Sequence, residues 1–360
     1  MSSRILTYDE IDRAEWSRLV RESRTGTWFQ TPEAYEFFAS QPELFVPFVV
    51  GIEGPTPNPS LKGGEEKPTS SLPSFQGRAG VRHTLRALCC GYVTVEKNPI
   101  KQFFTRRAII IGGPALADDA TNEEIRVLLE TVREQLKQQA IYIETRNFND
   151  YSQWKDAFIE TDFEYQPHLN FHVDCTNADE MWIRMSETRR KQIRRAQRAN
   201  VTISEAQSEK EIREWYVILK HMYQTKVKTP LFPVSFFEEA YRQGVATYLM
   251  VRYEGHIIGG SMIVVDGGCV YEWFECGRDV EYEKQYPSVM ATYAGMAYAA
   301  EHGIARCDFM GAGVPGVPYG VRDFKERFGG KMVEHGRFLY IAKPILYQIG
   351  AFGVKIMKGL

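Results

Sequence analysis

The chain shows the same order of predicted secondary structure twice, and this duplication limits the folds that it can adopt. In each half, antiparallel strands precede a helix, a strand, a short helix and a final strand. The four elements span 122–139, 140–146, 151–160 and 168–175 in the first half. They span 286–303, 305–311, 324–328 and 336–343 in the second half. This order indicates two mixed sheets covered by helices, so we predict an α+β fold with two similar domains.

The length of 360 residues agrees with two domains, because single cores seldom grow beyond about 250–300 residues. The predicted parts are a first domain at 1–175, a second domain at 176–342 and an amphipathic helix at 343–360. Residues 54–82 are rich in Pro, Gly, Ser and charge and lack periodicity, so we predict a disordered insertion there. It separates two apolar runs, 44–52 and 84–96, which we predict to pair as strands around a long hairpin loop.

The composition argues against several classes of protein. A net charge of −2 gives no general attraction to nucleic acid, so contact with a polyanion would be local. The six cysteines contain no CxxC pair and have no histidine at metal-ligand spacing, so we expect neither disulfides nor a metal site. The histidines form no triad pattern with Ser or Cys. Without an apolar leader or a long apolar run, the protein is predicted to be cytoplasmic. The C-terminal helix either packs on its own domain or lies at the inner face of the membrane.

The densest charge lies in MSETRRKQIRRAQRANVTI, residues 185–203. Together with Arg184, this segment has seven basic side chains in fifteen residues and one acid. On a helix, Arg190, Arg194 and Arg198 fall on one line, and Thr176 with Asp179 could cap the helix start. Like charges at this density repel each other unless an anion lies nearby. The segment therefore indicates either a solvated face or a partner that carries phosphate, pyrophosphate or a nucleic-acid backbone.

Two loops of the second half follow predicted strands. The loop after Cys276 contains Gly277 as its one glycine and several acids, which weakens a site for the coenzyme A pyrophosphate. Such sites bring the backbone N–H groups of closely spaced glycines to the anion. The loop after Asp308 has four glycines between 311 and 320, and Lys325 stands beside it at the start of a predicted helix. Loops at strand ends often form sites, so Asp308 and Lys325 are candidates.

Several of these segments together resemble the FemABX family, the aminoacyl-tRNA-dependent peptidyltransferases that build peptidoglycan bridges. The resemblance is carried by ETRRKQIRRAQRANVTI, YEWFECGRD, YPSVMATYAGMAYAAEHGIARCDFMG and RDFKERFGG, and by the opening EWSRLVRESRTGTWFQTPEAYEFF. It covers both halves apart from 54–82. It implies two tandem GNAT-like domains. It also implies transfer of an amino acid from aminoacyl-tRNA to an amine of a lipid- or nucleotide-linked peptidoglycan precursor, with no further cofactor.

The resemblance also implies site residues. Lys325 and Phe324 match the lysine and the aromatic residue that the family uses at the reacting centre, and Asp308 is a candidate for orienting the amine. The candidates for binding the precursor or the tRNA are Arg189, Arg190, Arg194, Arg195, Gln30 and Thr31. Where the family often has Trp and a basic residue after the Gln-Thr pair, this chain has 35–37, YEF. The long helical arm of some members is absent, because 206–243 leave room for two ordinary helices.

Two other functions agree with the same residues. The first is an acyl-CoA-dependent N-acyltransferase on the same fold. The second is a non-catalytic protein that docks tRNA or an anionic membrane through residues 184–198 and the C-terminal helix. The second alternative predicts that Lys325 is dispensable while the arginines are required.

Overall fold

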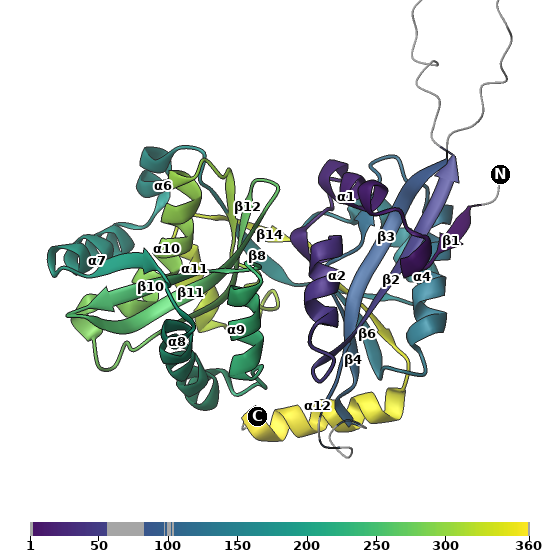
Figure 1. The fold of residues 1–360 in the computed structure, drawn as a ribbon. Helices are drawn as coiled ribbons and strands as arrows, with labels where there is room; N and C mark the ends of the chain where they lie inside the picture. The colour runs from purple at the N-terminus through teal and green to yellow at the C-terminus, as the bar shows by residue number, and fades with distance from the viewer. Residues whose placement is uncertain (1–2, 56–82, 97, 99–101, 103, 359–360) are drawn as a thin grey trace, which may run out of the picture.

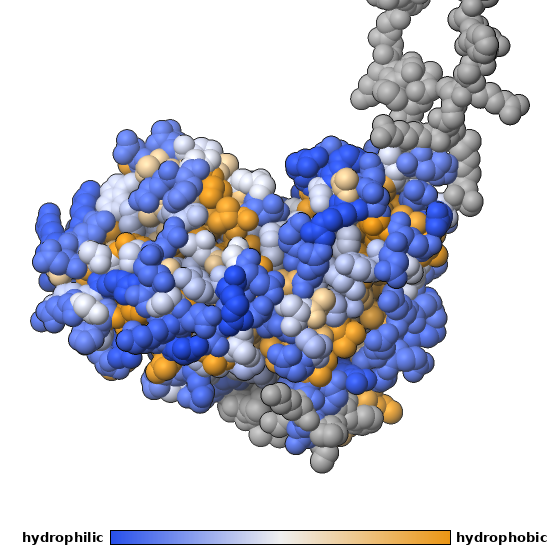
Figure 2. Space-filling model, in the orientation of Figure 1, coloured by the Kyte–Doolittle hydropathy of each residue, from blue (hydrophilic) through white to orange (hydrophobic). Residues whose placement is uncertain are grey.

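The computed structural model describes residues 3–55, 83–96, 98, 102 and 104–358. Figure 1 shows two lobes side by side, each built on a sheet with helices packed against it. Figure 2 shows that this face of the molecule is largely hydrophilic and has a notch between the lobes. Nearly all of the predicted insertion at 54–82 lies outside the described residues.

The first sheet has the strand order β1-β2-β3-β4-β6-β15-β7, and β5 pairs with β3 at one side. Its strands are β1 (Arg4–Leu6), β2 (Phe45–Pro55), β3 (His83–Thr94), β4 (Arg107–Gly112), β5 (Ala115–Leu116), β6 (Tyr142–Asn147), β7 (Glu164–Gln166) and β15 (Arg337–Ile341). The helices of this lobe are α1 (Arg13–Glu22), α2 (Pro32–Ala39), α4 (Asn122–Leu136) and α5 (Lys155–Glu160). β2 and β3 pair as an antiparallel hairpin, as the sequence predicts.

The second sheet has the order β14-β8-β13-β12-β11-β10-β9. Its strands are β8 (Leu169–Asp174), β9 (Thr202–Glu205), β10 (Thr247–Tyr253), β11 (His256–Asp266), β12 (Cys269–Gly277), β13 (Arg306–Asp308) and β14 (Lys331–Glu334). The helices of this lobe are α6 (Ala178–Arg184), α7 (Glu187–Arg198), α8 (Glu209–Met222), α9 (Val234–Arg242), α10 (Pro287–Glu301) and α11 (Gly320–Glu326). The antiparallel strands predicted before the helix of the second half are confirmed as β10, β11 and β12. Residues 206–243 hold two main helices with a π-helical turn, Tyr223–Val227, after the first.

The two lobes exchange one strand each. β8 follows the first-lobe strands in sequence but pairs with β13 and β14 of the second sheet. β15 comes near the C-terminus but pairs with β6 and β7 of the first sheet. The sheets therefore do not divide at residue 175, where we place the domain boundary from the sequence. A strand pairs with whichever sheet edge its apolar face can cover, and the order of strands along the chain does not specify that choice.

The lobes share an aromatic core. Phe29 of the first lobe contacts Trp273 of β12 edge to face at 5.0 Å between ring centroids, and Phe37 contacts Phe236 of α9 at 5.4 Å. These rings belong to one continuous cluster of buried residues that draws on both halves. Edge-to-face pairs favour a fixed geometry, so the lobes are held at one angle.

The helices begin where side chains cap their free N–H groups. Thr121 and Glu124 form a capping box at the start of α4. The basic segment forms two helices in place of one, because Asn177 caps α6 and Ser186 caps α7. The expected cap by Thr176 and Asp179 is therefore wrong.

The last helix, α12 (Pro344–Lys358), runs along the underside of the molecule in Figure 1. One side packs on the first lobe, where Tyr347 contacts Tyr142 at 5.5 Å between ring centroids. Ile345 and Ile349 are 75% and 50% exposed on the other side. In the part of the chain that the structure describes, no helix is both long enough and apolar enough to span a bilayer.

Candidate active site

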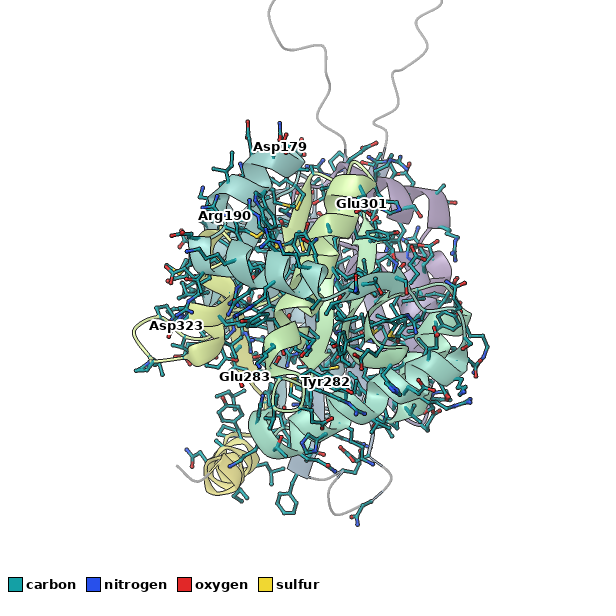
Figure 3. The ribbon with its side chains drawn as sticks, turned by 90° about the vertical axis from the view of Figure 1, so that its left-hand side faces the viewer. Asp179, Arg190, Tyr282, Glu283, Glu301 and Asp323 are labelled. Atoms are coloured by element: carbon teal, nitrogen blue, oxygen red, sulfur yellow. The ribbon has the colours of Figure 1, made fainter. Side chains whose placement is uncertain are left out.

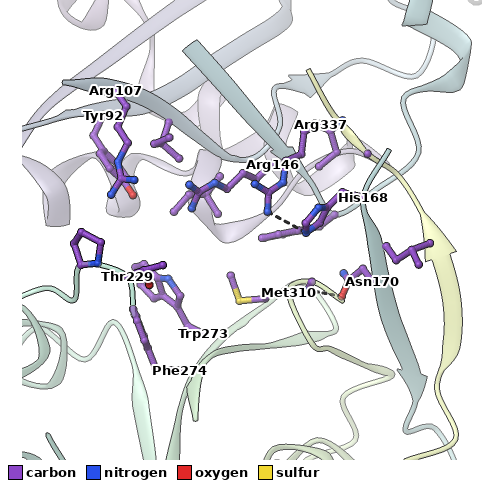
Figure 4. A pocket seen from close by; sticks show the side chains of 18 of the residues that line it. Tyr92, Arg107, Arg146, His168, Asn170, Thr229, Trp273, Phe274, Met310 and Arg337 are labelled. Atoms are coloured by element: carbon purple, nitrogen blue, oxygen red, sulfur yellow. Dashed lines mark hydrogen bonds between the residues drawn. The ribbon is translucent and has the colours of Figure 1, made fainter. Parts of the chain in front are cut away.

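A cleft of about 340 Å³ lies between the two lobes. Strands β3, β4 and β6 and the end of β15 line one side, and β12 and the loop after β13 line the other (Figure 4). The segments at which the chain crosses between lobes, His168–Asn170 and Gly336–Arg337, also line it. The strand exchange therefore builds part of the cleft wall.

The first-lobe side of the cleft is cationic. Arg107, Arg146 and Arg337 line it. Glu144 accepts hydrogen bonds from the Arg146 Nε at 2.8 Å and from an Arg337 amino group at 2.9 Å. Burial raises the pKa of Glu144, but the two guanidiniums outweigh burial and lower that pKa to about 2. Arg107 has no ion pair with any described residue, so the cleft keeps an excess of positive charge.

His168 adds a neutral polar group to this wall. Its Nε2 lies 3.1 Å from an Arg337 amino group (Figure 4). Burial, reinforced by the Arg337 charge, lowers the pKa of His168 to about 4. The imidazole is therefore neutral near pH 7, and its Nε2 accepts the hydrogen bond from Arg337.

The opposite side of the cleft is aromatic. Trp273 and Phe274 line it from β12, together with Tyr223 and Phe232. Trp273 and Phe274 both face the cleft because β12 has a bulge there: Met262 pairs with Phe274, whereas Ile263 pairs with Glu272. A bulge re-aims side chains in this way. A cationic wall opposite aromatic rings suits an anionic ligand that also has a flat or apolar part.

The loop after β13 forms the floor of the cleft and is held by buried side chains. Asp308 accepts hydrogen bonds from the Asn170 Nδ2 and from the Met310 N–H, both at 2.7 Å. The Asn170 Oδ1 accepts from the Gly311 N–H at 2.8 Å. Asp308 is 0% exposed, and although burial raises its pKa, contact with His172 and Asn170 leaves that pKa below its ordinary value. Asp308 is therefore buried and fixes the loop through these hydrogen bonds.

Lys325 holds the same loop from behind. Its Nζ donates hydrogen bonds to the Phe309 carbonyl at 2.7 Å and to the Gly311 carbonyl at 3.1 Å. The side chain is 9% exposed. Gly311 and the left-handed Met310, with φ of 54°, face the cleft on the other side of this loop. Lys325 thus lies one backbone segment away from the cleft.

Phe324 lies next to Lys325 on α11 and packs under an arginine. The Arg189 guanidinium lies 4.4 Å from the Phe324 ring centroid and 4.5 Å from that of Phe328. Arg189 also donates to the Phe324 carbonyl at 3.0 Å and is 4% exposed. Burial lowers the pKa of Arg189 to about 10, with a contribution from Arg327. Arg189 therefore joins α7 to α11 and is not available as a surface contact.

The other candidate arginines lie on the outer side of α7. Arg194 lies over the Trp182 ring at 5.2 Å, and Arg195 donates to the Tyr286 hydroxyl at 3.1 Å. Figure 3 looks onto this face and labels Arg190, which has no ion pair with a described residue. These three arginines remain candidates for an anionic partner, but they do not line the interdomain cleft.

Gln30 and Thr31 take local structural positions. Gln30 is 0% exposed, and its side-chain amide bonds to the Cys90 and Ile111 carbonyls and to the Cys90 N–H. The Thr31 hydroxyl caps α2 by accepting from the Ala34 N–H at 3.1 Å. Gln30 therefore joins α2 to the first sheet and offers no free group to a precursor.

A second cavity of about 250 Å³ lies where β12 leads into α10. At the N-terminus of α10, the Asp279 carboxylate accepts from the Ser288 N–H at 3.0 Å and from the Ser288 hydroxyl at 2.6 Å. Helix N-termini bind anions through such N–H groups. Here the protein's own carboxylate occupies that position, in agreement with the glycine-poor loop. Among the described residues, no cluster of His, Cys, Asp and Glu could hold a metal ion.

Sequence reasoning missed the cationic wall. Arg107, Arg146 and Arg337 are far apart in the sequence and come together through the parallel pairing of β4 with β6 and the antiparallel pairing of β6 with β15. The sequence signal is one basic residue in each of three strands, of which Arg107–Gly112 and Arg337–Ile341 are otherwise apolar. That signal becomes informative only when the exchange of β15 is known.

The comparisons with known proteins agree with this architecture. Residues 184–326 match the family model of the acetyltransferase (GNAT) domain. The crystal structure of FemX matches with a TM-score of 0.67 and 16% identity, over 97% of this chain and 99% of that chain. A tandem GNAT protein from the clavulanic acid biosynthesis pathway matches with a TM-score of 0.55 and 8% identity, over 95% and 99% of the two chains. No curated protein matches the sequence.

A third structure is the C-terminal domain of a protein named as a lysylphosphatidylglycerol synthetase, from Agrobacterium fabrum. It matches with a TM-score of 0.52 and 11% identity, over 74% of this chain and 85% of that chain. The matches confirm the predicted α+β fold of two tandem GNAT-like domains, and they support the prediction of a transferase. The chain thus has the fold of FemX, and residues 184–326 in its second half match the GNAT domain model.

Proposed function

We propose that this protein is an aminoacyltransferase that moves an amino acid from aminoacyl-tRNA to an amine of a phosphate-bearing peptidoglycan precursor. The observation that carries the proposal is the interdomain cleft, where three arginines stand against one glutamate and face aromatic rings. Guanidinium groups bind phosphate oxygens through paired hydrogen bonds. The resemblance to the FemABX family supplies the donor and the class of acceptor.

In the proposed reaction, the acceptor amine attacks the ester carbonyl of the aminoacyl-tRNA. An amide bond forms, the ester bond breaks and the ribose hydroxyl leaves. Lys325 acts on this centre from behind the cleft floor: its ammonium ties the Phe309 and Gly311 carbonyls and adds positive charge beside them. Fixed positive charge stabilises the oxyanion that develops during acyl transfer.

Arginines on the outer side of α7 suit the tRNA backbone. Arg190, Arg194 and Arg198 share one helix, and salt-sensitive phosphate contact is the usual role of such a face. An acyl-CoA donor fits less well, because Asp279 already occupies the N-terminus of α10 and would repel a pyrophosphate. If the precursor is lipid-linked, the proposal also includes contact between the C-terminal helix and the membrane. Ile345 and Ile349 are exposed on that helix for such a contact.

The test is transfer of a radiolabelled amino acid from a total charged-tRNA pool to an extract of cell-envelope precursors. Wild type and Arg107→Ala are assayed together, with Arg106→Ala as the matched control, since Arg106 is exposed and does not line the cleft. We expect labelled product from wild type and the control and much less from Arg107→Ala at low acceptor concentration. Transfer from an acyl-CoA mixture but not from tRNA would replace the proposal with the CoA-dependent alternative. Binding of tRNA without any transfer would indicate a docking protein.

A further inference from the structure

The segment that joins α8 to α9 forms part of the cleft and is otherwise exposed. Four of its residues line the aromatic side of the cleft: Tyr223, Thr229, Pro230 and Phe232. All residues of 224–230 are exposed, and we call these residues the strap. Exposed segments with few buried contacts change conformation at a low cost in free energy. The strap can therefore move while the core of the lobe stays intact.

The strap is anchored at both ends. After it, the Phe232 carbonyl accepts a hydrogen bond from the Tyr216 hydroxyl at 3.0 Å. At its start, the π-helical turn Tyr223–Val227 closes with a hydrogen bond from the Lys228 N–H to the Tyr223 carbonyl at 2.7 Å. Turns of this kind are rare and are frequent at functional sites. The strap is thus a short loop with fixed ends.

Lys228 has a strained backbone at the edge of the cleft. Its φ of 54° and ψ of 37° place it in the left-handed region, which a long side chain seldom adopts. Residues strained in this way cluster at ligand clamps and switch regions. Lys228 is held between two residues that line the cleft, because its N–H bonds to Tyr223 and Thr229 follows it in the chain. The strained residue therefore lies next to the space for a ligand.

The charge of Lys228 has no partner among the described residues. The nearby Lys226 Nζ, in contrast, lies 3.9 Å from the Asp279 Oδ2. Arg107 also has no ion pair with a described residue, and Figure 4 shows it on the opposite side of the cleft from Thr229. No carboxylate side chain of the described residues lines the cleft. Two cations from different lobes thus flank the cleft, and an anion between them would remove their repulsion.

We propose that Lys228 is a further binding residue of the cleft. When a phosphate group lies beside Arg107, the strap moves toward the first lobe and the Lys228 ammonium closes on the phosphate. Ammonium and guanidinium groups both bind phosphate oxygens through charge-assisted hydrogen bonds. The inference rests on the proposed function, which supplies the phosphate-bearing acceptor.

Limited digestion with trypsin tests the movement without a transfer assay. Trypsin cuts after exposed lysines, so the bond after Lys228 reports on the strap. Inorganic pyrophosphate at ten times its Kd should slow this cut about tenfold in wild type, because binding depletes the open state by that factor. Arg107→Ala should lose the protection. Arg106→Ala, at an exposed position outside the cleft, should keep it.

A charge variant separates the ammonium from the rest of the strap. Lys228→Asn removes the charge but keeps a residue that tolerates the left-handed backbone, and Lys228→Arg keeps the charge. Calorimetry should show about tenfold weaker binding of pyrophosphate by Lys228→Asn and nearly wild-type binding by Lys228→Arg. Lys220→Asn, at an exposed lysine of α8 outside the cleft, is the control. Wild-type affinity in Lys228→Asn would overturn the inference.

The same measurements distinguish failure of this inference from failure of the proposed function. Pyrophosphate that binds wild type without slowing the cut after Lys228 would overturn the strap closure and leave the proposed function in place. Absence of pyrophosphate binding by wild type would exclude the cleft as a phosphate site and would overturn both. Protection by phosphatidylglycerol vesicles but not by pyrophosphate would assign the strap to a lipid surface and overturn the clamp.

Discussion

The two lobes differ where the strand before the main helix pairs with the strand after it. In the first lobe, β4 and β6 flank α4 in the sequence and pair in parallel along Arg107–Gly112 and Tyr142–Asn147. In the second lobe, β12 and β13 flank α10 but pair only along Cys269–Tyr271 and Arg306–Asp308. β12 then continues to Gly277 without β13 beside it. The first sheet is therefore continuous at this point, and we call its lobe the closed lobe. The second sheet separates between β12 and β13, and we call its lobe the open lobe.

Under the proposed function, this difference gives each lobe a separate task. The closed sheet presents Arg107 and Arg146 from neighbouring strands as a fixed cationic surface. The open sheet leaves room for the 309–311 loop, which Lys325 ties from behind. Under the proposed function, one lobe supplies charge for binding, and the other supplies Lys325 at the cleft floor.

The largest expected effect comes from the open lobe. Lys325→Ala should lower the rate of transfer about 10²–10³-fold, because it removes the ammonium and both ties to the cleft floor. Single-turnover kinetics with charged tRNA measure the loss. Lys331→Ala, an exposed residue of β14, serves as the control. An unchanged rate in Lys325→Ala would show that the open lobe does not depend on this lysine.

Loss of an arginine from the closed lobe should weaken binding of the acceptor. Arg107→Ala should raise the KM for the acceptor roughly 10- to 100-fold and leave kcat nearly unchanged. A hydrogen bond to a charged group contributes about 1.5–3 kcal/mol. The difference between wild type and variant should shrink as salt is added. A fall in kcat at constant KM would contradict the division of tasks between the lobes.

The crossing segment at His168 should make stability depend on pH. Folding lowers the pKa of His168 from its ordinary value of 6.5 to about 4, so the unfolded state takes up a proton first as the pH falls. Its contribution is fully present above pH 6.5 and is lost as the pH falls from 6.5 toward 4. Urea denaturation at pH 7 and pH 5 should show a loss of about 1–2 kcal/mol in wild type that His168→Gln lacks. Equal losses in both proteins would exclude this histidine as the cause.

The smallest effect is expected at the N-terminus of α10. Asp279→Ala should lower the free energy of unfolding by about 1 kcal/mol, because the Ser288 N–H loses its acceptor. Thermal denaturation measures this change, and Glu281→Ala on the same loop is the control. Binding of acyl-CoA by Asp279→Ala but not by wild type would show that the carboxylate excludes that donor. A wild-type unfolding midpoint would show that the cap contributes nothing.

Local signals in the sequence were enough for most elements. The apolar runs at 44–52 and 84–96 pair as β2 and β3, and the periodic stretch at 286–303 forms α10 at Pro287–Glu301. Phe324 of α11 and Phe328, just after the end of this helix, lie with their rings 5.4 Å apart. Propensity, periodicity and turn residues act over a few positions, so a single sequence carries them.

The sequence by itself determined two α+β units, their helices and strands, and a lysine next to a glycine-rich loop. Only the tertiary structure decided that β8 and β15 exchange sheets, which pairs Arg337 with Arg146 in the cleft wall that also contains Arg107. It likewise decided that Arg189 and Gln30 are buried and that Glu272 faces α10. The physical reason is that strand pairing and burial depend on contacts between residues far apart in the chain, and no local pattern specifies those contacts.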